Sequence, residues 1–151
     1  MLKNNMEFDD NIEEIIKSVF SMNLSVDGGW GYNEELATHL KKSEIPTIQL
    51  EHTIASMRTH LDMNITRKEE ERYGGINLNE ISREEYYSNS QLYHKVSYAV
   101  TAIKEKEYNT FIEEYKEHYG KKDFDMSEYF ERRREATLGK TEIYWFRIDF
   151  E

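Results

Sequence analysis

The hydrophobic pattern changes its period within residues 92–119. Between residues 92 and 103, apolar residues alternate with small or polar ones, which places one apolar row on a single face of a strand. From Glu105 to Tyr119 the apolar residues recur instead with the spacing of a buried helical stripe. A helix is the alternative for 92–103, because four residues also fit a helical stripe: Val96, Ala99, Val100 and Ile103. We favour the strand, since Val, Thr, Ile and Tyr suit a pleated surface.

Similar periodicity elsewhere predicts the remaining elements. Five residues near the N-terminus have the i, i+3, i+4, i+7, i+8 spacing of a helix: Ile12, Ile15, Ile16, Val19 and Phe20. The expected helices lie near 10–21, 47–63, 105–119 and 127–137, and the expected strands near 24–32, 76–83, 92–103 and 142–150. We therefore expect an α+β fold, with helices packed on a mainly antiparallel sheet of about four or five strands, in a single domain over residues 1–151.

Turn and cap residues set the expected boundaries. Asp27, Gly28 and Gly29 predict a tight hairpin turn, because glycine takes the positive φ that such a turn requires. The segment 33–42 has a ragged pattern that fits a helix or a continuing strand. A polar turn near 86–91 would join 76–83 to 92–103 as a second hairpin. Expected helix boundaries are caps at Thr47 and Ser127, a glycine at Gly120 after one helix, and a stop at Gly139.

Composition excludes several classes of protein. The 151 residues contain 38% hydrophobic and 13% aromatic residues, enough to fill a core, so we expect a folded chain. There is no cysteine, which excludes disulfides, thiol catalysis and thiolate metal sites and suits a reducing compartment. The first ten residues lack the pattern of a signal peptide, and uncharged runs such as 18–26 are too short to cross a membrane. We expect a cytoplasmic protein that does not bind membranes.

The net charge of −10 is concentrated near the N-terminus. Residues 1–40 hold two Lys and eight Asp or Glu, a balance of −6, and the rest of the chain contributes −4. Such a surface repels nucleic acid and favours a basic protein partner, although solubility alone is the alternative explanation. Tyr and Trp often anchor protein interfaces. The candidate partner-binding residues are therefore Asp9, Asp10, Glu13, Glu14, Trp30, Tyr32, Glu34 and Glu35.

Motifs for metal or nucleotide chemistry are not found in the sequence. His52 and His60 are eight residues apart, about 12 Å along a helix, so they do not bind one ion together. The glycines of residues 28–31 lack the third glycine of a dinucleotide-binding loop, because Glu34 stands there. Arg132 to Arg134 are flanked by Glu131 and Glu135 and are expected to form a salt-bridged helix face. We expect no cofactor and no metal.

Three segments lie within about residues 24–119: Asp27 to Tyr32, Tyr73 to Leu78, and the strand and helix from Val96 to Tyr119. Together they resemble small bacterial immunity proteins, the antidotes encoded beside polymorphic or contact-dependent toxins. The resemblance implies an acidic, non-enzymatic inhibitor that covers the active site of a toxin, often a nuclease, and it identifies no residues. The alternatives are a self-associating accessory protein and, third, a small hydrolase-type enzyme with His52, Glu51 and His60 lining a cleft.

Overall fold

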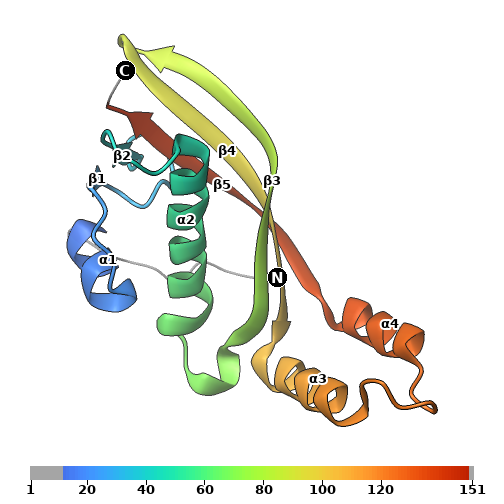
Figure 1. Cartoon of the computed structure of the whole chain (residues 1–151). Helices are drawn as coiled ribbons and strands as arrows, with labels where there is room; N and C mark the ends of the chain where they lie inside the picture. The colour runs from blue at the N-terminus through green and yellow to red at the C-terminus, as the bar shows by residue number, and fades with distance from the viewer. Residues whose placement is uncertain (1–11, 150–151) are drawn as a thin grey trace.

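The computed structural model describes residues 12–149. It shows an α+β fold with four helices and a mixed, mostly antiparallel sheet of five strands (Figure 1). In chain order the elements are α1 (Ile12–Phe20), β1 (Val26–Gly28), β2 (Thr38–Leu40), α2 (Thr47–His60), a π-helical turn η1 (Leu61–Ile65), a 3₁₀ turn η2 (Glu69–Glu71), β3 (Tyr73–Ser88), β4 (Gln91–Lys104), α3 (Glu105–His118), α4 (Met126–Ala136) and β5 (Leu138–Ile148). The predicted fold class is confirmed.

A long hairpin of β3 and β4 forms one side of the sheet. The strand interpretation of 92–103 is confirmed, and every second residue of β4 is buried: His94, Val96, Tyr98, Val100 and Ala102. The two strands are joined by Asn89 and Ser90, which have φ of 53° and 66°. Two consecutive residues with positive φ form the primed turn that suits the twist of a hairpin. The predicted hairpin is therefore correct, but its turn is shorter than the expected 86–91.

β5 lies at the centre of the sheet, whose order is β1-β2-β5-β4-β3. It runs antiparallel to β4 and parallel to β2. The alternation predicted for 142–150 is confirmed within the described residues, since Tyr144, Phe146 and Ile148 are buried. The strand begins earlier than expected, at Leu138. Gly139 therefore lies inside β5 and does not end the preceding helix.

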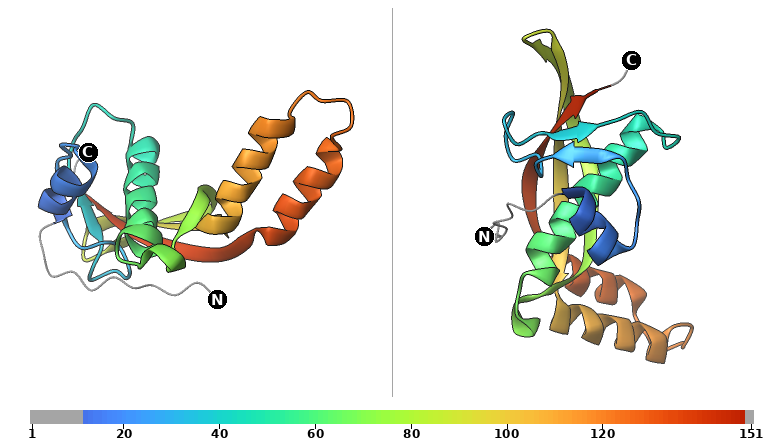
Figure 2. Two further views of the ribbon diagram at one scale, coloured as in Figure 1. Left: turned by 90° about the horizontal axis from the view of Figure 1, so that it is seen from below. Right: turned by 90° about the vertical axis from the view of Figure 1, so that its left-hand side faces the viewer.

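The helices divide into two groups (Figure 2). α1 and α2 share one core with the sheet, in which their buried side chains pack with Val96, Tyr98, Tyr144 and Phe146. α3 and α4 lie side by side and project from the far end of the long hairpin. They are joined by a hydrogen bond from the Tyr129 hydroxyl to the Phe111 carbonyl. Within residues 12–149, no helix combines the length and apolarity needed to cross a membrane.

The first predicted hairpin is wrong. Asp27 and Gly28 lie in strand β1, not in a turn, and β1 pairs with β2 across a loop of residues 29–37. β1 pairs with β2, and β2 is held in place by its pairing with β5. This long-range contact between β2 and β5 overrides the local turn signal of the glycines. The undecided segment 33–42 contains the end of this loop and strand β2.

Two of the helix caps are also corrected. α4 is capped by Asp125, whose side chain accepts a hydrogen bond from the Glu128 N–H at 3.1 Å, and Ser127 lies inside the helix. α2 begins after Pro46 and has no side-chain cap, so Thr47 is its first residue. Gly120 has φ +83° just after α3, as the sequence predicts for a helix end. The expected cap of the first helix, at Asp9 or Asp10, lies outside the described residues.

Candidate functional site

Helix α2 buries charged side chains as well as apolar ones. Its predicted apolar stripe is confirmed, with four buried residues: Leu50, Ile54, Met57 and, just after it, Leu61. Four polar residues on and directly after α2 are also buried: Glu51, Arg58, Thr59 and Asp62. A buried charge is costly unless it is paired and hydrogen-bonded. These residues are therefore the first candidates for a site.

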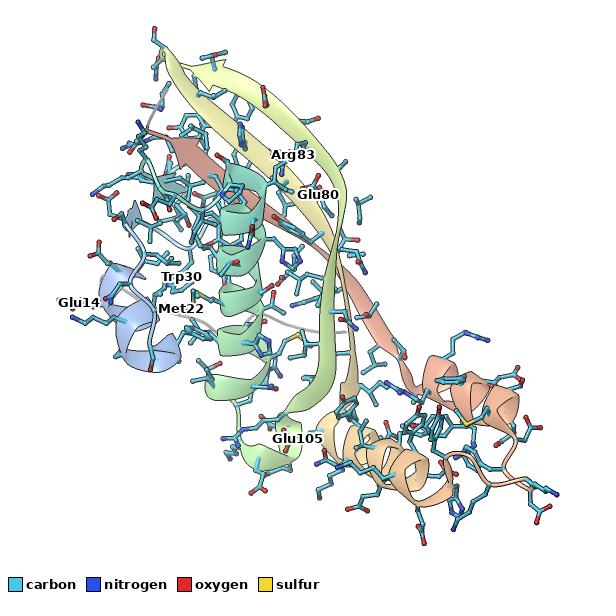
Figure 3. The ribbon with its side chains drawn as sticks, viewed as in Figure 1. Glu14, Met22, Trp30, Glu80, Arg83 and Glu105 are labelled. Carbon is cyan, nitrogen blue, oxygen red and sulfur yellow. The ribbon has the colours of Figure 1, made fainter. Side chains whose placement is uncertain are left out.

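The first cluster surrounds Glu51, which is 0% exposed. One carboxylate oxygen accepts from His94 Nδ1 at 2.8 Å, and the other accepts from Arg83 Nη2 at 3.1 Å. Arg83 also donates to Glu80 at 2.7 Å, and this bond holds the pKa of the Glu80 carboxyl below its usual range. Figure 3 shows Arg83 and Glu80 on β3 beside α2. The cluster therefore ties the helix to β3 and β4.

The second cluster surrounds Arg58, which is 2% exposed. Its guanidinium lies between two rings, 4.4 Å from the centroid of Tyr32 and 4.3 Å from that of Tyr144. It donates to the carbonyl oxygen of Trp30 at 3.1 Å and to that of Ile143 at 3.0 Å. Arginine suits this position because its planar guanidinium can stack on aromatic faces while its N–H groups donate hydrogen bonds in the plane of the group.

Acidic residues next to Arg58 share a lysine from β5. Lys140 Nζ lies 3.0 Å from Glu142 and 3.4 Å from Asp62, which sits in the π-helical turn η1. Glu142 also accepts from the Thr59 hydroxyl at 2.9 Å. Each buried carboxylate therefore has a cationic or hydroxyl partner.

The central side chains of these two clusters, Glu51 and Arg58, are closed to solvent. Burial, followed by the negative charge of Glu51, raises the pKa of Tyr98, so this phenol remains neutral. The Tyr98 hydroxyl and Arg58 Nε have no hydrogen-bond partner among the described residues. A substrate could not reach Glu51 without displacing α2, because its side chain is completely covered. The clusters are best explained as polar contacts that position α2 on the sheet.

The histidines proposed for an enzyme do not meet. His52 Nε2 lies 3.1 Å from the Leu78 carbonyl oxygen on β3, and its ring packs edge-on against Tyr98. His60 is exposed at the other end of α2. Glu51 faces the sheet, whereas its neighbour His52 is exposed. The arrangement brings no pair of these three groups together.

A further set of possible metal ligands lies where β1, β2 and the end of β5 meet. Ligand atoms of Asp27, His39 and Asp149 lie within 4.8 Å of one another. However, Lys41 Nζ lies 3.1 Å from Asp27, and Arg147 donates to both oxygens of Asp149 at 2.7 and 2.8 Å. Two cations thus already balance the two carboxylates, and either would repel a divalent ion by about 4 kcal/mol per unit charge at 4 Å near a protein surface. The geometry favours an ion-pair network over a metal site.

The Asp27 carboxyl provides a pH prediction. Partial burial alone would raise its pKa, but hydrogen bonds and charge from Lys41 and His39 outweigh this and lower it. A lowered pKa means that Asp27 stabilises the fold above about pH 4 and that this contribution is lost as the pH falls through its folded pKa. In an NMR titration, Lys41→Met should move the Asp27 midpoint upward, while the exposed neighbour variant Lys42→Met should leave it in place. Equal midpoints in wild type and Lys41→Met would contradict the assignment.

A hollow of about 170 Å³ lies between the end of the α2 region and the start of α3. Its lining residues are Arg67, Glu70, Glu71, Arg72, Tyr73 and Lys104. The Nε atoms of the two arginines donate to the backbone carbonyls of Asp62 and Arg67. With acidic and basic groups mixed in its wall, the hollow indicates no particular ligand.

The predicted partner-binding residues separate into three groups. Asp9 and Asp10 lie outside the described residues, while Glu13, Glu14 and Glu35 are exposed. Glu34 is half-buried and accepts from the Tyr86 hydroxyl at 3.3 Å. Trp30 needs correction, because it is only 5% exposed, whereas Tyr32 is half-buried with its ring against Arg58. Both rings contribute to the core rather than to an open surface.

Comparison with protein-family models, curated proteins and solved structures finds no match to this chain.

Proposed function

We propose that this chain is a protein-binding module whose partner is a basic protein. The observation that supports this most directly is the surface of α1 and the loop 29–37, where exposed carboxylates accompany exposed apolar side chains. Glu13, Glu14 and Glu35 supply the charge. The apolar residues are Val19, Met22 and Leu36, which are 41%, 36% and 48% exposed. Figure 3 shows Glu14 on the outer side of α1, and Met22 between α1 and α2 in the same view.

Charge and apolar area have separate effects in such an interface. Exposed acidic groups attract a basic partner and accelerate the encounter, and burial of apolar side chains then slows dissociation. The charged residues under α2 do not contribute to this attraction, because they are paired with one another inside the protein. The resemblance to immunity proteins makes a toxin domain the first partner to test.

Two double charge-reversal variants should show whether the location of the negative charge matters or only the net charge of the protein. Glu13→Lys with Glu35→Lys changes the net charge by as much as Glu113→Lys with Glu131→Lys, two exposed positions on α3 and α4. The first pair should reduce the association rate for a basic partner by about tenfold or more at low salt. The second pair should have a much smaller effect. Surface plasmon resonance at two salt concentrations measures both.

The partner itself should be sought by co-expression with the product of the adjacent gene, followed by size-exclusion chromatography. We expect a stable complex and protection from any toxicity of that product. An equal loss of rate in the two charge-reversal pairs would show that only net charge matters, and this would contradict the proposed surface. If the purified chain binds no basic protein and light scattering shows a homo-oligomer, the accessory-protein alternative replaces the proposal.

A further inference from the structure

The outer edge of β3 is the longest sheet edge among the described residues. β3 is the last strand in the sheet order and has 16 residues, whereas the strand at the opposite border, β1, has three. Figure 1 shows β3 along the border of the sheet, with β4 on its inner side. A strand edge carries backbone N–H and C=O groups that can pair with another chain.

Only one part of this edge is regular and open. The first part approaches α3, where Tyr108 packs against Gly74 and Gly75, and the Leu78 carbonyl is in contact with His52. The register with β4 shifts between Gly74 and Asn77 and again between Glu80 and Ser82. Such bulges obstruct pairing at an edge. From residue 82 to residue 88 the register continues without a further shift.

The hairpin turn establishes which backbone groups of 82–88 point outward. Asn89 and Ser90 form a two-residue primed turn, so the flanking pair Ser88 and Gln91 exchanges both backbone hydrogen bonds. Pairs alternate along an antiparallel ladder between bonded and non-bonded. The N–H and C=O groups of Tyr87, Glu85 and Arg83 therefore point away from β4.

The opposite side of the ladder agrees with this alternation. The same alternation of bonded and non-bonded pairs, continued across β4 to β5, predicts that the Trp145 N–H points away from β4. The Trp145 N–H does so, since it donates to the Gly31 carbonyl at 2.9 Å. Within residues 12–149, the N–H groups of Arg83, Glu85 and Tyr87 make no backbone hydrogen bond to a turn or loop, and the ladder alternation turns them away from β4. These three amides are available for pairing.

Side chains at this edge determine the kind of strand that fits. Glu84 and Glu85 are exposed, and Glu85 also lies 3.4 Å from His94 Nε2. The charge of Arg83 is already paired with Glu51 and Glu80. Tyr87, at 73% exposed, adds apolar surface. Glu84 and Glu85 are neighbours in the strand, so their carboxylates lie on opposite faces of the sheet. An extended segment with alternating Lys or Arg would place its charges on one face, beside one of these carboxylates, and opposite charges across a strand pair are stabilising.

A second copy of this chain fits the same edge less well when the two copies pair about its central residue, Glu85. If two copies paired symmetrically about Glu85, the two Glu85 side chains would lie directly opposite one another. Like charges in that position destabilise a strand pair. We propose that residues 82–88 of β3 form a β-augmentation site for an extended basic segment of a protein partner. This inference rests on the proposed function and assigns a second contact surface to it.

Amide hydrogen exchange tests the site in the wild-type protein. The probe is an eight-residue peptide of alternating lysine and valine, and the control is the matching peptide of glutamate and valine. The lysine peptide should slow the exchange of the Arg83, Glu85 and Tyr87 amides by about tenfold or more. Exchange at Ser82, Glu84 and Tyr86, whose N–H groups already bond to β4, should change little. Absence of this alternating protection, or equal protection by both peptides, overturns the proposal.

A pair of variants at Glu85 isolates the backbone contribution. Glu85→Pro removes the outward N–H without breaking a bond to β4, and Glu85→Ala removes the same carboxylate but keeps the N–H. We expect Glu85→Pro to bind the lysine peptide or the partner protein at least about tenfold more weakly than Glu85→Ala. Equal binding by the two folded variants overturns the edge site and leaves the proposed function standing.

Two other outcomes are also decisive. If protection of these amides develops without peptide and increases with protein concentration, a second copy occupies the edge and the proposal is wrong. If the wild-type chain binds no basic protein partner, the proposed function fails, while the peptide experiment still decides the chemistry of the edge. The peptide measurement needs no variant, so a folding defect in Glu85→Pro cannot obscure it.

Discussion

Replacing Arg58 with alanine is expected to lower the free energy of unfolding by about 3–5 kcal/mol, as removal of one member of a buried ion pair does. The guanidinium is 2% exposed and lies 3.8 Å from Glu142. Its loss leaves the carbonyl oxygens of Trp30 and Ile143 without their donor and leaves a gap between the rings of Tyr32 and Tyr144. The lysine partner of Glu142 remains, so the loss is expected at the lower end of this range.

Urea unfolding monitored by tryptophan fluorescence measures this loss, because Trp30 lies in the affected core. Arg58→Lys should fall between wild type and Arg58→Ala, since an ammonium keeps the charge but cannot donate to both carbonyls while stacked. Arg134→Ala removes an exposed arginine from α4 and should change stability by less than about 0.5 kcal/mol. A loss below about 1 kcal/mol for Arg58→Ala would show that this cluster contributes little to holding α2 on the sheet.

The residues of α2 show what periodicity can and cannot predict. The spacing of Leu50, Ile54, Met57 and Leu61 predicts the helix and its apolar stripe, and both are confirmed. The same pattern does not predict that Glu51 and Arg58 are buried, although both are. Their burial depends on partners from β3, β4 and β5, which lie far away in sequence. A single sequence contains no signal for such pairs.

The two hairpins show the same limit in the sheet. β3 and β4 are adjacent in sequence and are joined by two residues, so alternation and turn chemistry predict their pairing. β1 and β2 have three residues each, too few for a period to be recognised, and β2 is placed by its contact with β5. The glycines after Asp27 therefore suggested a turn that long-range pairing does not form.

The candidate interaction surface was predicted in part. Negative charge near the N-terminus is visible in the sequence, and Glu13, Glu14 and Glu35 are exposed. Aromatic content cannot distinguish a surface ring from a core ring, and Trp30 lies in the core. The acidic edge of β3 could have been found from Glu84 and Glu85 beside Tyr87, once that segment was recognised as a strand. Its position at the border of the sheet depends on the order of strands, which the sequence pattern does not reveal.

Gly31 links the loop 29–37 to the Arg58 cluster, and its replacement by alanine should destabilise the protein by about 2–5 kcal/mol. Its φ is +76°, and an added Cβ would overlap the ring of Tyr144, which stacks on Arg58. Backbone strain and steric overlap should therefore add. Its N–H donates to Leu36 and its carbonyl accepts from Trp145, so the backbone cannot easily move away.

Gly120→Ala is the matched control for this prediction. Gly120 has a similar φ of +83°, but nothing lies within 4 Å of an added Cβ. Gly120→Ala should lower the free energy of unfolding only by the backbone strain of a left-handed residue, about 1–2 kcal/mol. The difference between the two variants in thermal and urea unfolding should therefore measure the steric overlap with Tyr144. Equal losses would show that Tyr144 can move aside, and the stacking of Arg58 would then be less rigid than the structure indicates. A larger loss for Gly31→Ala would instead show that the loop, Tyr144 and Arg58 form one packed unit beneath the proposed binding surface.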